Sequence, residues 1–182
     1  MERSMLIAGF GGQGVQTLGK LLTYTANEEE LFVTFYPSYG AEMRGGTSNC
    51  TVVFSDSEIA APYRSSVDCV VALNQPSYAT FFKSVRPGGT FLMNSNLIAE
   101  TEGRDDIRII GIPLNDMASE VGSPQVLNII LIGFLSEYLN GLSSESALAV
   151  VKKKLGKRKD LLELNIKAFN MGVELAKKQG KQ

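Results

Sequence analysis

Residues 9–14 read GFGGQG and directly follow an apolar run at residues 5–8. The glycines at positions 9, 11 and 14 fit the G-x-G-x-x-G spacing of a strand-to-helix turn that binds nucleotides. Glycine lets the backbone turn tightly and approach a phosphate, and the N–H groups that open the following helix attract anions. The motif predicts a strand–turn–helix unit and leaves three interpretations: a dinucleotide site, a site for another phosphate, or a structural turn.

A dinucleotide site also needs an acidic residue about 20 positions further on, at the end of the second strand, to hold a ribose. Here the second strand ends in FYPSYG, and Glu28, Glu29 and Glu30 precede that strand, at its wrong end. The missing acid argues against tightly bound NAD. A phosphate of another ligand and a purely structural turn both stay open.

Strand-like and helix-like segments alternate along the rest of the chain. The predicted strands are 5–10, 32–36, 49–55, 67–73, 90–94 and 107–112. The predicted helices are 13–27, 76–82, 113–121, 124–139, 143–155 and 161–178, with a loop at 37–47 and a turn at 86–89. This order predicts one α/β domain over residues 1–182: a doubly wound, mostly parallel, Rossmann-like three-layer sheet with C-terminal helices.

The composition excludes several kinds of site. The chain has no histidine, which excludes a Ser-His-Asp or Cys-His nucleophile and a histidine-ligated metal. Cys50 and Cys69 are the only cysteines and cannot form a metal cluster by themselves, so we expect a reduced cytoplasmic pair. No apolar run is long enough to span a membrane and no signal-peptide layout is present, so we expect a cytoplasmic protein. Any redox chemistry must then reside in a bound cofactor or another chain.

The net charge of −1 hides an asymmetry along the chain. Residues 1–151 carry 8 basic and 16 acidic side chains, whereas residues 152–182 carry 10 basic and 3 acidic ones. Much of the excess lies in KKKLGKRK, residues 152–159. These lysines can be a solvated helix end, where positive charge is favourable, or a surface for an anionic ligand or partner. No aromatic residue interleaves the run, so we expect no nucleic-acid binding.

Two longer segments carry a family resemblance: GFGGQGVQTLGKLL at 9–22 and YPSYGAEMRGGTSNCTVVFSD at 36–56. Together they resemble the gamma subunit, or gamma domain, of 2-oxoacid:ferredoxin oxidoreductases, nearest the 2-oxoglutarate and branched-chain 2-oxoacid branch. The later segments ALNQPSYATF, GGTFLMNS, NIILIGFL and NIKAFNMGVE agree. The resemblance therefore covers roughly residues 4–176, nearly the whole chain.

The resemblance implies an enzyme that is assembled from several subunits. The complex oxidatively decarboxylates a 2-oxoacid, attaches the acyl group to coenzyme A (CoA), and passes electrons to ferredoxin. Alpha and beta subunits and a ferredoxin-like delta subunit are the expected partners, and they would hold thiamine diphosphate, magnesium and iron–sulfur clusters. This chain would contribute no catalytic residue of its own, would act only within the complex, and could also associate with itself.

The resemblance also implies a role for the glycine turn, because this domain lies beside the CoA path in the family. The candidate contacts to the CoA phosphates are Gly11, Gly12, Gln13 and Gly14. Arg44 is the candidate charged partner, since a guanidinium pairs well with phosphate. An ion pair of Arg44 with Glu42, or a contact to another subunit, is the competing interpretation.

Six further residues are candidates for a binding loop, a subunit interface or a ligand contact: Tyr39, Glu42, Gly45, Gly46, Asn74 and Gln75. Asn74 and Gln75 follow a strand, at the sheet edge where open α/β sheets bind ligands, but they can equally cap the next helix. Two other classes of function stay open: a stand-alone nucleotide-binding protein and a purely structural interaction module.

Overall fold

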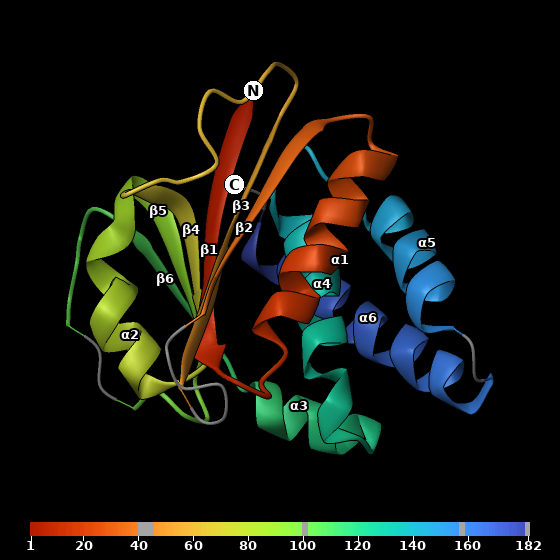
Figure 1. The fold of residues 1–182 in the computed structure, drawn as a ribbon. Helices are drawn as coiled ribbons and strands as arrows, with labels where there is room; N and C mark the ends of the chain where they lie inside the picture. Colours follow the sequence, from red (N-terminus) through yellow and green to blue (C-terminus); the bar gives the residue numbers. More distant parts are fainter. Residues whose placement is uncertain (40–45, 100–101, 157–158, 181–182) are drawn as a thin grey trace.

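A six-stranded sheet forms the middle layer of the protein, with helices on both of its faces (Figure 1). The computed structural model describes residues 1–39, 46–99, 102–156 and 159–180. The strands are β1 (Glu2–Phe10), β2 (Phe32–Tyr39), β3 (Thr47–Ser55), β4 (Val67–Ala72), β5 (Val85–Asn94) and β6 (Arg108–Ile112). The helices are α1 (Val15–Glu28), α2 (Gln75–Phe81), α3 (Leu114–Val121), α4 (Leu127–Tyr138), α5 (Ser144–Leu155) and α6 (Lys159–Gln179), with short 3₁₀ helices η1 (Phe82–Ser84) and η2 (Pro124–Val126).

The strands lie in the order β2-β3-β1-β4-β5-β6. β1, β4, β5 and β6 pair in parallel, whereas β3 is antiparallel to its neighbours β1 and β2. Five strands therefore run one way and β3 runs the other, which confirms the predicted α/β class and the mostly parallel sheet. β3 runs antiparallel to β2 because only seven residues of the chain separate the two strands. A parallel pair would need a crossover connection of a dozen or more residues.

Two segments that were predicted to be irregular belong partly or wholly to strands. The predicted loop at 37–47 was too long, since residues 37–39 continue β2 and Pro37 pairs with Cys50 of β3. An edge strand tolerates proline because one side of its backbone needs no partner. Residues 40–45 lie outside the described residues.

The predicted turn at 86–89 was wrong, because these residues lie within β5. Between the pairs Val67–Val85 and Cys69–Thr90, β4 advances by two residues and β5 by five. In this stretch β5 therefore contains three residues more than β4, and the register between the two strands shifts. The Pro-Gly-Gly sequence lies in this irregular part of the pairing and does not end the strand.

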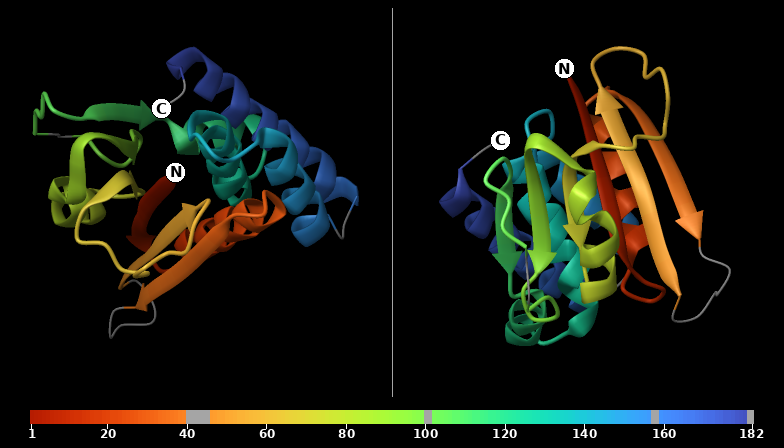
Figure 2. Two further views of the ribbon diagram at one scale, coloured as in Figure 1. Left: turned by 90° about the horizontal axis from the view of Figure 1, so that it is seen from above. Right: turned by 90° about the vertical axis from the view of Figure 1, so that its left-hand side faces the viewer.

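The larger hydrophobic core lies between the sheet and the helices α1, α4, α5 and α6, and a smaller one lies under α2 on the opposite face (Figure 2). α4 is the most central helix, and Ile130, Leu131, Ile132, Phe134 and Leu135 are fully buried. A helix that is apolar on all sides is expected to be enclosed in this way. None of the helices within the described residues is long and apolar enough to cross a membrane.

The two faces of the sheet are used in turn by successive helices. β1 leads into α1 on one face, and β4, the parallel neighbour of β1, leads into α2 on the other (Figures 1 and 2). This confirms the predicted doubly wound arrangement. The crevice outside the carboxyl ends of β1 and β4 is thus the topological switch point of the sheet, the usual place for a ligand in such folds.

Candidate functional site

The glycine turn lies at this switch point, between the end of β1 and the start of α1. Its backbone is left-handed at Gly12 (φ 99°) and at Gly14 (φ 77°), and Gly14 caps α1 without a side-chain hydrogen bond. The Gln13 N–H donates to the carbonyl of Phe10 at 3.1 Å, which closes the turn. The first N–H groups of α1 therefore remain directed out of the helix, where an anion can accept them.

The two left-handed glycines have different surroundings. A Cβ atom added to Gly14 would lie 1.8 Å from Nδ2 of Asn128, so the turn is pressed against the start of α4 there. A Cβ atom added to Gly12 would meet nothing within 4 Å, and Gly12 is exposed. Gly14 thus serves the packing of the turn, whereas Gly12 leaves the backbone open to an approaching molecule.

The side chain of Gln13 joins the turn to the neighbouring strand end. Its Oε1 accepts from the N–H of Phe10 and from Nδ2 of Asn74, both at 2.7 Å, and its Nε2 lies 3.4 Å from the carbonyl oxygen of Leu73. Asn74 in turn caps α2, because its Oδ1 accepts from the N–H of Ser77 at 2.9 Å. The structure brings these two predicted residues together, and both side chains hold the switch point in shape.

The other predicted residues are distributed around the turn. Gly46 accepts a hydrogen bond from the Gly11 N–H at 3.0 Å, which ties the start of β3 to the turn. Gln75 opens α2 and accepts from the N–H of Ala99 at 3.3 Å. Tyr39 is the last residue of β2, opposite Ser48. Three predicted residues lie outside the described residues: Glu42, Arg44 and Gly45.

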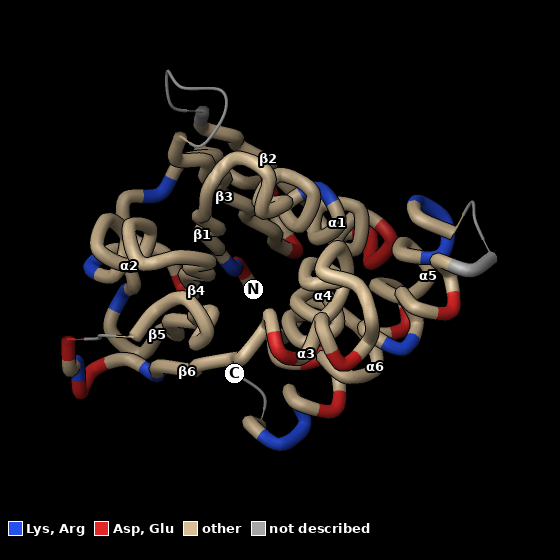
Figure 3. Tube along the Cα trace, turned by 90° about the horizontal axis from the view of Figure 1, so that it is seen from below, with Lys and Arg blue, Asp and Glu red and all other residues tan. Residues whose placement is uncertain are grey.

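A groove of about 420 Å³ opens beside the turn, a size suited to a small ligand or part of a larger one. Gly12, Gln13 and Thr17 form one wall. The other walls come from Leu73, Leu97, Asn115, Pro124, Gln125, Leu127, Asn128, Ile129 and Leu155. None of these described lining residues is charged, and Figure 3, which views the molecule from this side, shows few charged segments around the start of α1.

Asn128 is a site residue that the sequence interpretation missed. Its Nδ2 donates to the carbonyl oxygen of Gln13 at 3.4 Å, and its Oδ1 is buried without a hydrogen-bond partner in the described part of the chain. The available signal was an amide inside the otherwise apolar segment 126–135, but 115 residues separate Asn128 from Gln13. A contact at such a sequence distance is set by the packing of α4, which no local pattern encodes.

The groove continues into a smaller one of about 170 Å³, which shares Gln125, Ile129 and Leu155 with it. Leu161, Leu164 and Asn165 of α6 line the far end. A ligand can therefore extend from the turn along a wall of mixed polar and apolar side chains.

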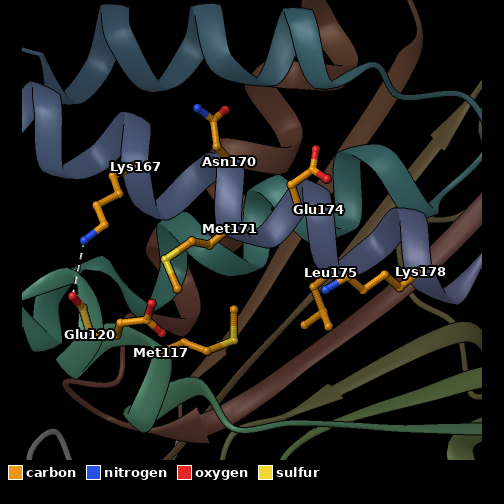
Figure 4. A pocket seen from close by; sticks show the side chains of 8 residues that line it. All are labelled: Met117, Glu120, Lys167, Asn170, Met171, Glu174, Leu175 and Lys178. Atoms are coloured by element: carbon orange, nitrogen blue, oxygen red, sulfur yellow. Dashed lines mark hydrogen bonds between the residues drawn. The ribbon is translucent and has the colours of Figure 1, made fainter.

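A second concavity, of about 480 Å³, lies between α3 and α6 (Figure 4). Met117, Met171 and Leu175 form its floor, and the ammonium group of Lys167 donates to the carbonyl oxygen of Glu120 at its rim, at 3.3 Å. Methionine-lined walls adapt to apolar side chains. This concavity shares no described lining residue with the groove at the glycine turn.

The two cysteines are buried, unpaired thiols. Burial raises the pKa of Cys50 to about 12, and burial together with the nearby carboxylate of Asp68 raises the pKa of Cys69 to about 12. Two protonated, enclosed thiols do not fit the four thiolate ligands of an iron–sulfur cluster. The described residues also contain no group of three or more His, Cys, Asp or Glu side chains placed to hold a metal ion.

Comparison with known proteins identifies related chains. The family model described as Pyruvate ferredoxin/flavodoxin oxidoreductase matches residues 4–175. The 2-oxoglutarate synthase subunit KorC of Methanothermobacter marburgensis is 35% identical over 96% of this chain and 97% of its own length. The ketoisovalerate oxidoreductase subunit VorA of the same organism is 35% identical over 97% of this chain, but this chain spans only 37% of its length.

Two solved structures share the fold. The 2-oxoglutarate:ferredoxin oxidoreductase of Magnetococcus marinus, with 2-oxoglutarate, coenzyme A and succinyl-CoA bound, superimposes with a TM-score of 0.90 at 25% identity, over all of this chain and 32% of that one. The gamma subunit of a keto/oxoacid ferredoxin oxidoreductase of Geobacter sulfurreducens superimposes with a TM-score of 0.82 at 27% identity, over 96% of this chain and 98% of that one.

Proposed function

Because this chain belongs to the pyruvate ferredoxin/flavodoxin oxidoreductase family, we propose that it is the gamma component of a 2-oxoacid:ferredoxin oxidoreductase. The complex would decarboxylate a 2-oxoacid oxidatively, form the acyl-CoA, and transfer electrons to ferredoxin. We propose 2-oxoglutarate as the substrate and a branched-chain 2-oxoacid as the runner-up. The preference for 2-oxoglutarate is supported by the 2-oxoglutarate synthase subunit, which this chain matches over nearly its full length. The ketoisovalerate oxidoreductase subunit is matched over only part of its length.

The proposed role of this chain is to bind CoA, and the glycine turn is the observation that carries it. The turn presents backbone N–H groups at the switch point, Gly12 is open to solvent, and the groove beside it has room for an elongated ligand. These groups can hold a phosphate by hydrogen bonds and by the positive end of α1, without a titrating side chain. Arg44 is the proposed charged partner.

Other subunits would hold the remaining cofactors. The two buried cysteines do not suit an iron–sulfur cluster, so the clusters, thiamine diphosphate and magnesium are assigned to alpha, beta and delta chains. The segment at the end of β2 and the start of β3, with Tyr39, Glu42, Gly45 and Gly46, is the proposed contact to these chains. The reduced cysteines fit a cytoplasmic complex.

The test replaces Gly12 by Val and Arg44 by Ala in the purified, assembled complex. Valine at position 12 adds bulk where the phosphate approaches, and alanine at 44 removes a charge-assisted contact worth about 1.5–3 kcal/mol, or roughly 10- to 150-fold in binding. We expect a raised KM for CoA in both variants, with the KM for the 2-oxoacid and the subunit composition unchanged. Gly88→Val is the matched control, because Gly88 is also left-handed with open space around its Cβ position but lies in β5. An unchanged KM for CoA in both variants would refute the site.

A structural role for the turn is the second candidate, and the Gln13–Asn74 hydrogen bond favours it, because that side-chain network is already complete without a ligand. In that case Gly12→Val would release the subunit from the complex, and Arg44→Ala would leave the KM for CoA unaltered. A stand-alone nucleotide-binding protein would instead bind NADH saturably as an isolated chain, whereas the proposed component would not.

A further inference from the structure

Two neighbouring lysines at the end of α5, Lys153 and Lys154, make different contacts with α1. Lys153 pairs with Glu28 of α1, with 3.2 Å between Nζ and Oε1. The neighbouring ammonium of Lys154 lies 3.8 Å from the centre of the Tyr24 ring, also on α1. The cation–π contact holds this ammonium beside α1 without neutralising its charge.

Tyr24 belongs to a row of exposed residues on α1. Thr17, Lys20 and Tyr24 are three and four positions apart, so they occupy one face of the helix. Thr17 lines the groove at the glycine turn. Since helical side chains lean toward the N-terminus of their helix, Lys20 leans toward Thr17 and the turn, and Tyr24 leans toward Lys20. The ammonium groups of Lys20 and Lys154 therefore lie on the same side of α1.

Neither of these two lysines has an acidic partner in the described part of the chain. Lys20 and Lys154 make no ion pair there, and the carboxylate of Glu28 pairs with Lys153. The first turn of α1 also contains no acidic residue. Lys20 lies in the second turn of α1, and Lys154 is held at Tyr24, in the C-terminal half of the helix. The two ammonium groups therefore continue the positive potential of the helix start along this face of α1.

The groove connects this cationic side of α1 with the glycine turn. Leu155, the residue after Lys154, lines both the larger groove and its continuation. The groove itself offers only neutral side chains among its described lining residues. Figure 3 shows basic segments on α1 and at the end of α5. A ligand with more than one anionic group would therefore meet neutral donors first and the two ammonium groups next.

We propose that Lys20 and Lys154 bind a second phosphate of the ligand, the ribose 3′-phosphate of CoA, while the glycine turn binds the diphosphate. This inference rests on the proposed function. Lys20 follows Gly14 by six residues, about 9 Å along the helix axis. A lysine side chain that leans back along α1 covers most of that distance, which suits two phosphate groups attached to one ribose.

The experiment compares CoA with dephospho-CoA, which lacks only the 3′-phosphate, in the purified, assembled complex. Lys20→Gln and Lys154→Gln should each raise the KM for CoA roughly two- to fivefold, the range for an exposed ion pair, and roughly tenfold together. The KM for dephospho-CoA should stay at the wild-type value in all variants, and the difference should shrink at high salt. Lys83→Gln removes an exposed lysine from η1 and is the matched control.

The outcomes separate this inference from the proposed function. If Gly12→Val raises the KM for both cofactors while the lysine variants alter neither, CoA binds at the turn and the inference is overturned. If wild-type complex uses CoA and dephospho-CoA with equal KM, the inference is also overturned. If neither the turn nor the lysines affect CoA, the proposed function itself fails.

Discussion

Gly14→Ala tests whether the glycine turn is held by its contact with α4. The substitution places an alanine at φ 77°, which costs about 1–2 kcal/mol for a residue with a Cβ atom. Its methyl group would also lie 1.8 Å from Nδ2 and 2.9 Å from Cγ of Asn128. The Asn128 amide must then swing away and give up its hydrogen bond to Gln13, which costs about another 1 kcal/mol.

Gly12→Ala provides the comparison, because Gly12 has φ 99° but open space around its Cβ position. Gly12→Ala should lower the free energy of unfolding by only the backbone strain of about 1–2 kcal/mol. Gly14→Ala should cost about 2–3 kcal/mol, which lowers the melting temperature by about 5–10 °C in a chain of this size. Urea unfolding followed by circular dichroism measures both free energies on the purified chain.

A double-mutant cycle with Asn128→Ala assigns the extra cost to one contact. Without the Asn128 side chain, Gly14→Ala should cost no more than Gly12→Ala does. The reasoning is refuted if the two alanine variants are equally unstable in the wild-type background, or if their difference persists when Asn128 is absent.

Three further predictions concern stability and reactivity. Iodoacetamide at pH 8 should modify Cys50 and Cys69 only after unfolding, because both thiols are buried and their pKa of about 12 keeps them protonated; labelling of the native chain by mass spectrometry would contradict this. The hydrogen bond from Ser143 lowers the pKa of Glu29 below the ordinary value of a glutamate. The ionised Glu29 side chain therefore stabilises the fold at a pH above that ordinary pKa, and this stabilisation is lost as the pH falls through the lowered pKa. Glu29→Gln should accordingly make the free energy of unfolding less dependent on pH on the acid side, as measured by unfolding at a series of pH values. Gly133→Ala should destabilise the chain by several kcal/mol, because its Cβ would lie 2.2 Å from a backbone oxygen of α6, and a melting temperature near wild type would refute that packing.

The sequence predicted the parts of the fold that depend on local pattern. The apolar run before GFGGQG became β1, and the apolar segment 126–135 became the buried helix α4. Ser123, the residue before the predicted helix 124–139, caps the η2 turn that precedes α4. In each case the signal and the structure involve neighbours in the chain, so periodicity and capping chemistry were sufficient.

The parts that could not be predicted depend on pairing between distant segments. Pro37 reads as a loop residue, but its strand continues because β3 supplies a partner. The Pro-Gly-Gly sequence in β5 reads as a turn, but it sits in a register irregularity that depends on β4. Asn128 enters the site only because α4 packs against the turn. Local propensity carries no information on such contacts, so they become visible only when the tertiary structure is known.

The chemistry of the groove limits what this chain can contribute to a reaction. Its described lining offers backbone N–H groups, amides and a hydroxyl, and none of these groups exchanges a proton near neutral pH. Such groups can bind and orient an anion at a constant strength over a wide pH range, but they cannot act as a general acid or base. If CoA lies in this groove, none of its described lining residues can act as the base that deprotonates the thiol, so we expect that base to come from another chain. The pH dependence of CoA binding and that of turnover should then differ, since the first reflects this chain and the second reflects its partners.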